Sequence, residues 1–471
     1  MTEQDRSFIR KYITQIPSVG KFLEHQKIKE LMSTFPRTII VESINQVFGS
    51  HKKKILSASR EEEIADIDLS FDTIFHQVSI LAEEKFRPSF RRIINATGNV
   101  LNGKMGRTPL NNFSAKVLAE NASGYISLDA KDGKGRDYHI QNWLSKFVES
   151  EDCLVVNNNS AAVMLILNTI ANQNEVIVSR GQLIDSDGFR LPEVIDKSGA
   201  KLVSVGATNK THLRDYTGAI RNETGAIMRV NKSSYQISGF SRDVSLDELI
   251  QLGKEYHIPV IDNIGNGFLF DMTQYGLPDE PSVFNSLKAG ADIVCFSGDK
   301  FLGGPQAGII TGNSQYISMM RENPLYRIMR VGKLTLITLE STLMSYLDME
   351  KITDNNTTIG YLLRSKDEIE NLVKKLLKLI GDDLSHVARI DTEDGFSYIP
   401  SHPNKFATKL VIIKPESLFV EDLDKRLKSS ETPVFGIIKD DKLVLDLRTL
   451  RDNEIEELAL SLKETFLFYE K

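Results

Sequence analysis

The stretch that decides the fold of this chain reads DIVCFSGDKFLGGPQAG and covers residues 292–308. Its apolar start, DIVCF, predicts a buried strand, and the glycines that follow predict a loop to whose backbone another group can come close. Lys300 lies on this loop. An isolated lysine is usually a solvated surface charge, but open α/β sheets bind ligands at the carboxyl ends of their strands. A desolvated lysine in that position can form a Schiff base.

A second signal lies about 140 residues upstream, in CLVVNNNSAAV at residues 153–163. The apolar run predicts another strand, and Asn158, Asn159 and Ser160 open a helix. Asn or Ser at a helix start is most often only an N-cap. The free N–H groups of such a terminus also bind phosphate. A phosphate cup after one strand and a lysine after another are what a pyridoxal phosphate enzyme of the aspartate aminotransferase fold requires.

Between and around these stretches, short apolar runs alternate with helix-like segments at intervals of about 20–30 residues. This rhythm predicts an α/β domain with a mostly parallel central sheet. We expect three parts: a basic helical N-terminal module at 1–87, a large α/β domain at 88–335 and a small α+β domain at 336–471. The runs that predict strands are 153–156, 175–179, 201–205, 226–230, 259–263 and 292–297.

The composition is that of an ordinary globular protein, with 471 residues, 26% charged residues and a net charge of −6. That charge is unevenly distributed, because residues 1–60 carry eleven basic and five acidic side chains. This excess fits either a solvated helical face or a polyanion contact. Cys153 and Cys295 lie in apolar runs and are expected to be buried free thiols. The polar start and the lack of a long apolar run predict a cytoplasmic protein without a membrane segment.

Several stretches resemble one family along nearly the whole chain: bacterial selenocysteine synthase, the L-seryl-tRNA(Sec) selenium transferases. Their number and order carry the resemblance, since some of them are generic one by one. The N-terminal ITQIPSVGKFL also resembles the opening of the family. The main matching stretches are RRIINATGNVL (91–101), GRTPL (106–110), CLVVNNNSAAV (153–163), SGAKLVSVGATNKTHLRDY (198–216), the SGDKFLGGPQAG region, NPLYRIMRVGKLTL (323–336) and KLVLDLRTL (442–450).

The resemblance implies a fold type I pyridoxal phosphate transferase that converts L-seryl-tRNA(Sec) to L-selenocysteinyl-tRNA(Sec) with selenophosphate. It implies that Lys300 holds the cofactor as an aldimine and then removes the serine α-proton, which leads to an aminoacrylyl intermediate. It also implies a tRNA-binding role for the N-terminal module and a large ring-shaped homo-oligomer. The implied cofactor-binding residues are Lys300, Asn158, Asn159, Ser160, Asn263 and Ser297, and the implied anion-binding residues are Arg107, Arg327 and Arg330.

The sequence departs from the family pattern where cofactor and substrate are expected. Residues 102–105 read NGKM, and only Gly106 and Arg107 keep the local pattern. Asn263 stands where an Asp normally pairs with the pyridine nitrogen of the cofactor. The neighbouring Asp262 is expected to point to the opposite face of the sheet. Residues 231–235 and the loop at 184–190 also differ from the family.

These departures leave two alternatives open. The first is a related pyridoxal phosphate lyase or transferase that acts on a small amino acid or an amino sugar acid. The second is a tRNA-binding protein without catalytic activity. Arg327 and Arg330, three residues apart on a predicted helix, also fit simple pairing with carboxylates.

Overall fold

The computed structural model describes residues 7–58, 60–129, 135–183, 185–186, 189–232, 237, 239–277, 279–398 and 405–467. The chain divides into two compact units, Met1–Arg92 and Ile93–Lys471. The predicted boundary between residues 335 and 336 therefore lies inside the second unit. None of the helices in the described part combines the length and apolarity needed to cross a membrane.

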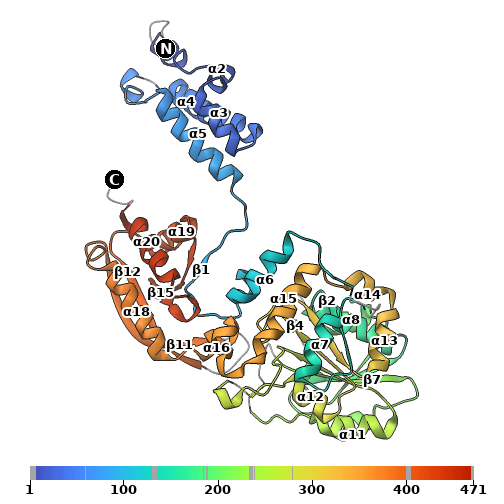
Figure 1. The fold of residues 1–471 in the computed structure, drawn as a ribbon. Helices are drawn as coiled ribbons and strands as arrows, with labels where there is room; N and C mark the ends of the chain where they lie inside the picture. The colour runs from blue at the N-terminus through green and yellow to red at the C-terminus, as the bar shows by residue number, and fades with distance from the viewer. Residues whose placement is uncertain are drawn as a thin grey trace. The chain divides into compact units, whose positions relative to one another are not determined.

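The first unit is helical (Figure 1). It has an apolar core of its own. Ile28, Ile40, Ile44 and Val78 are among the apolar side chains that its helices bury against one another. Its basic side chains lie mostly on the exposed faces of these helices. The helices are α1 (Ser7–Ile13), α2 (Val19–Leu23), α3 (Gln26–Thr34), α4 (Arg37–Ser57) and α5 (Phe71–Phe86).

The second unit is built on a seven-stranded sheet with the order β2-β10-β9-β8-β7-β3-β6. Every neighbouring pair is parallel except the two that β10 makes, with β2 and with β9. The predicted mostly parallel sheet is confirmed. The strands are β2 (Asp152–Val156), β3 (Glu175–Ser179), β6 (Lys201–Val205), β7 (Thr224–Val230), β8 (Val260–Gly265), β9 (Ile293–Ser297) and β10 (Gly308–Gly312).

Helices cover both faces of this sheet and form two apolar cores. Successive side chains of a strand point to opposite faces of the sheet, so alternate residues pack in the two cores. Cys153 belongs to one core and Leu154 to the other. One face is covered by α7 (Tyr138–Phe147), α11 (Leu246–Tyr256), α12 (Val283–Ala289) and α15 (Lys333–Met344). The other is covered by α8 (Asn159–Ile170), α9 (Leu191–Lys197), α13 (Ser314–Glu322) and α14 (Pro324–Met329).

The C-terminal part of the second unit carries a four-stranded antiparallel sheet in the order β11-β12-β15-β14. A third core lies between this sheet and its helices. The short strand β1 (Ile94–Asn95) pairs with β13 (Val434–Phe435), so residues just after the first unit belong to this core. The elements are β11 (Ala388–Tyr398), β12 (Lys405–Pro415), β14 (Ile437–Lys439), β15 (Lys442–Asp446), α18 (Lys366–Ile380), α19 (Val420–Ser429) and α20 (Glu454–Leu467).

Candidate active site

The loop that carries Lys300 follows β9 directly and is held by its own backbone. The N–H of Gly298 donates to the carbonyl of Ala307 at 2.8 Å, and the N–H of Gly304 donates to the carbonyl of Gly298 at 2.8 Å. A side chain at Gly298 would overlap the carbonyl of Pro305. Lys300 is half-buried. The loop therefore fixes the lysine at the carboxyl end of a buried strand, as the sequence predicted.

Side chains from a distant segment secure the far half of this loop. The carbonyl of Leu302 accepts hydrogen bonds from Asn356 Nδ2 at 2.9 Å and from the Tyr346 hydroxyl at 3.0 Å. The Phe301 ring stacks on Phe268 with 4.3 Å between centroids. These contacts are buried, so the loop around the lysine has little freedom to move.

The predicted phosphate cup lies at the start of α8. Asn158 is the N-cap, and its side chain accepts a hydrogen bond from the N–H of Ala161 at 2.9 Å. Gly308 on β10 packs so tightly against this turn that any side chain there would overlap the carbonyl of Asn158. Ser160 is half-buried in the first turn of the helix. Ser297, also predicted, is buried at the end of β9 and lies opposite Gly308 in the β9–β10 pairing.

Asn159 joins the cup to the next predicted residue. Its Nδ2 donates to Oδ1 of Asn263 on β8 at 2.8 Å. Asp262 points the other way, as expected: its carboxylate pairs with Arg229 at 2.7 and 2.8 Å and accepts from the Ser286 hydroxyl at 2.6 Å. Asp262 is thus committed to a buried ion pair on the opposite face. Asn263 faces the cup with an amide in place of a carboxylate.

The residues around the cup fit pyridoxal phosphate on structural grounds. Oδ1 of Asn159 is buried and has no hydrogen-bond partner in the described part of the chain. A buried acceptor of this kind calls for a donor that the described residues do not supply, such as a bound group or an ordered water. The helix start offers N–H groups to a phosphate, and the half-buried lysine lies two strands away across β10.

Arg107 is presented by a tight turn built from the divergent segment. Asn102 caps the short helix Gly103–Met105, and its carbonyl accepts the N–H of Arg107 at 2.9 Å. Arg107 adopts a left-handed conformation with φ of 68°. Its Nη1 donates to the carbonyl of Leu101 at 2.9 Å, and its Nε lies 3.7 Å from Oδ2 of Asp299. The altered residues still bring a guanidinium next to the lysine loop.

Arg327 and Arg330 lie on and just after α14, and both are exposed. Arg330 forms an antiparallel bridge with Val156, and the N–H of Asn157 donates to the carbonyl of Met329 at 2.9 Å. The end of α14 is thereby attached to the strand that leads into the cup. Neither arginine forms an ion pair with a described carboxylate. Within the described residues of one chain, no contact joins them to Arg107.

Asp299 and Tyr326 are two residues of this region that the sequence did not single out. Asp299 precedes Lys300 and faces Arg107. Its position next to Lys300 in the lysine loop could have identified it from the sequence. The Tyr326 hydroxyl donates to the buried carboxylate of Asp137, which ties α14 to the start of α7. Burial raises the pKa of Asp137. No local sequence pattern links Tyr326 to Asp137.

The two other divergent segments are only partly described. Asn231 donates to Glu280 at 2.8 Å. Residues 233–235 lie outside the described residues, as do 184, 187 and 188 of the other loop.

One solved structure, described as D-glucosaminate-6-phosphate ammonia-lyase, superposes with a TM-score of 0.55 at 18% identity, covering 83% of this chain and 99% of that one. This likeness concerns the fold, and the predicted fold type I class is confirmed.

Sequence comparison is more specific. The family model "SelA: L-seryl-tRNA selenium transferase" matches residues 93–451. An L-seryl-tRNA(Sec) selenium transferase of Alkaliphilus oremlandii is 39% identical, and one of Alkaliphilus metalliredigens is 41% identical. Each match covers 96% of this chain and 98% of the relative. The chain therefore belongs to the L-seryl-tRNA selenium transferase family.

Proposed function

We propose that this chain converts L-seryl-tRNA(Sec) to L-selenocysteinyl-tRNA(Sec), with selenophosphate as the selenium donor and pyridoxal phosphate as the cofactor. The observation that carries the proposal is the convergence of the Lys300 loop, the cup at Asn158 and the Asn159–Asn263 pair at neighbouring strand ends, in a chain that matches its relatives over nearly its whole length. The expected location is the cytoplasm.

In this scheme Lys300 holds the cofactor and, once released, takes the proton from Cα of the seryl group. The bound cofactor supplies an electron sink. The N–H groups at the start of α8 would bind its phosphate, and Asn263 would present an amide to its ring. The serine hydroxyl would leave Cβ as water, the selenium of selenophosphate would bond to Cβ while Cα regains a proton, and water would then cleave the Se–P bond and release phosphate.

The three arginines are proposed to bind the anionic donor. A guanidinium presents several N–H donors in a plane that matches phosphate oxygens. Arg327 and Arg330 are exposed and do not contact Arg107 within the described residues of one chain. We propose that they complete a site in a neighbouring copy, in line with the ring-shaped homo-oligomer expected from the resemblance.

The first unit is proposed to bind the tRNA. Several of its basic residues are engaged within the unit, as Lys11 is with Glu61 and Lys27 with Asp72. Lys52, Lys53 and Lys54 on α4 are exposed and form no ion pair with a described residue. Exposed lysines of this kind are able to contact the phosphates of a nucleic acid and displace its counterions.

The test is a visible spectrum of the cofactor-loaded protein before and after addition of serylated tRNA, followed by selenium transfer from selenophosphate. We expect the cofactor band to shift with serylated tRNA and not with free serine. A loaded protein whose spectrum ignores serylated tRNA but responds to a small amino acid would favour the lyase alternative instead.

A further inference from the structure

Asn263 places a buried amide near the carboxyl end of β8, on the strand next to the one that leads into the lysine loop. The residue is only 2% exposed. Its carbonyl accepts the N–H of Asn231 at 2.9 Å, and it pairs with Val230 on β7 and with Cys295 on β9. The sheet therefore fixes where this amide lies.

The described residues use only one half of the Asn263 amide. Oδ1 accepts from Nδ2 of Asn159, in the cup, at 2.8 Å. Nδ2 of Asn263 donates to no described residue and is open to its surroundings, whereas Oδ1 of Asn159 is sealed off. Polar groups in an interior are normally paired. The amide thus offers an unused hydrogen-bond donor beside the predicted phosphate cup.

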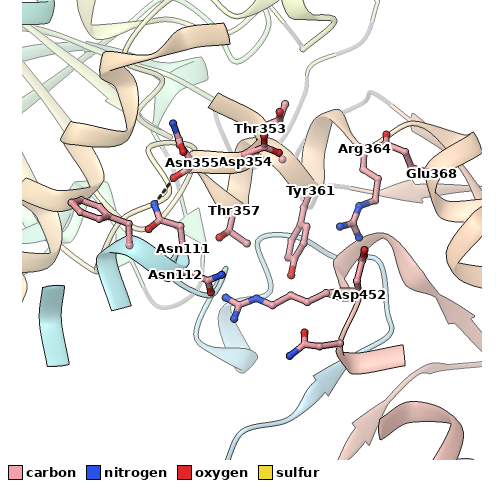
Figure 2. A pocket seen from close by; sticks show the side chains of 14 residues that line it. Asn111, Asn112, Thr353, Asp354, Asn355, Thr357, Tyr361, Arg364, Glu368 and Asp452 are labelled. Atoms are coloured by element: carbon pink, nitrogen blue, oxygen red, sulfur yellow. Dashed lines mark hydrogen bonds between the residues drawn. The ribbon is translucent and has the colours of Figure 1, made fainter. Parts of the chain in front are cut away.

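Asn111, in a separate polar cavity, shows an asparagine whose amide is fully used by the fold. It caps α6 (Asn112–Ala122), where its Oδ1 accepts from the N–H of Ser114 at 2.7 Å. Its Nδ2 donates to the carbonyl of Asn355, as the dashed line in Figure 2 shows. Both halves of that amide have structural partners. Asn263 differs because its donor half is left over.

The carboxylates described around these strand ends already face other donors. Asp262 pairs with Arg229 on the opposite face of the sheet. Asp299 lies 3.7 Å from Nε of Arg107, and Glu280 accepts from the side-chain amide at the end of β7. A cationic ring nitrogen bound beside β8 would therefore meet a neutral amide instead of a counter-ion. Burial without a counter-ion disfavours the charged form of such a group.

From the unused donor and the missing counter-ion we infer that Asn263 donates from Nδ2 to the ring nitrogen of pyridoxal phosphate and keeps that nitrogen unprotonated. The inference rests on the cofactor of the proposed function and extends it. A carboxylate would have the reverse effect, because a negative charge stabilises the protonated, cationic ring. Oδ1, the atom that would accept from a protonated nitrogen, already accepts from Asn159.

An unprotonated ring is compatible with the proposed replacement at Cβ. It is a weaker electron sink than a protonated one, since hydrogen bonds to the ring nitrogen tune the electronics of the cofactor. When Lys300 takes the Cα proton, the electron pair left behind forms the second bond between Cα and Cβ as the hydroxyl leaves. The ring therefore need not hold that pair for long.

The test is solid-state ¹⁵N NMR of the full-length protein loaded with pyridoxal phosphate that carries ¹⁵N in its ring. Free cofactor in acid and in alkali gives the reference positions of the protonated and the unprotonated nitrogen. At neutral pH we expect the parent at the unprotonated position. Asn263→Asp should shift the resonance to the protonated position, because the new carboxylate stabilises the cation.

Asn313→Asp is the matched control. It makes the same change at the N-cap of α13, where Asp caps as well as Asn, at the end of β10 that lies away from the cup. Its resonance should coincide with that of the parent. If Asn263→Asp fails to fold, the position of the parent resonance against the two references still decides.

Two results would overturn the inference alone: a bound cofactor whose nitrogen is protonated in the parent, or a resonance that Asn263→Asp leaves in place. The visible band of the bound cofactor is recorded first. A parent that retains no pyridoxal phosphate would overturn the proposed function and the inference together, so the two failures are distinguishable.

Discussion

The lysine loop and the N-terminal unit place their positive charges in opposite ways. Lys300 is half-buried on a loop whose backbone is tied to itself and to β10. Lys52, Lys53 and Lys54 project from α4 into solvent. A group that reacts needs desolvation and a fixed position, whereas lysines that neutralise a polyanion need to be accessible to its phosphates. The net charge of the whole chain describes neither region.

Removal of the lysine side chain should have the largest effect. Lys300→Ala is expected to abolish the visible band of the bound cofactor and to lower selenium transfer by at least about 10²–10⁴-fold, because it removes both the covalent attachment and the proton acceptor. Absorbance and single-turnover assays measure both. Lys288→Ala, an exposed lysine on α12, is the control. tRNA affinity should be unchanged, and a parallel decrease in tRNA binding would contradict the division of roles.

Deletion of residues 1–92 should weaken tRNA binding and leave the bound cofactor in place. The boundary follows the compact units, so the remaining chain is expected to keep its cofactor band. Its binding to tRNA should weaken and become much less dependent on salt, since the basic side chains of the first unit are absent. Filter binding at several salt concentrations measures this. Unchanged affinity would assign tRNA recognition to the second unit.

A methyl group at Gly308 should damage the cup without touching the lysine. Gly308→Ala forces a carbon into the carbonyl of Asn158, and overpacking of this kind costs about 1–3 kcal/mol. We expect a lower melting temperature and weaker cofactor retention. Gly332→Ala is the control, because no atom lies within 4 Å of the added carbon. Equal melting temperatures for the two variants would contradict the close packing at the cup.

The smallest effect is expected from the exposed lysines. Replacement of Lys52, Lys53 and Lys54 by Gln should lower the slope of log affinity against log salt by up to about one for each phosphate that these lysines neutralise. Lys27→Gln removes a lysine that already pairs with Asp72 and should change the slope less. Slopes from salt titrations of tRNA binding provide the comparison, and identical slopes would place the tRNA on another face of the unit.

Much of the sheet could be predicted from sequence because its strands are buried and apolar. All six predicted strand runs form strands. The prediction did not single out β10, whose five residues follow a glycine-rich loop and include two glycines. It also missed β11, which carries several charged residues and is a strand because it pairs with β12 over eleven residue pairs. Tertiary pairing decided both cases, not local preference.

Only the parts of the site that are built from continuous sequence motifs could be predicted. The lysine loop and the cup have recognisable patterns in the chain, and the opposite orientations of Asp262 and Asn263 follow from strand geometry. The Arg107–Asp299 pair joins residues almost two hundred positions apart. It depends on a left-handed turn that no apolar period encodes. Pairs of this kind arise from the assembled fold.

The antiparallel strand β10 has a further consequence for the chemistry. Because it pairs with β2 on one side and with β9 on the other, the strands that lead into the cup and into the lysine loop lie two strand spacings apart, about 9–10 Å. Backbone hydrogen bonds alone set that length. Substitution of side chains around the site can therefore change which substrate enters, but not the spacing between these two strands.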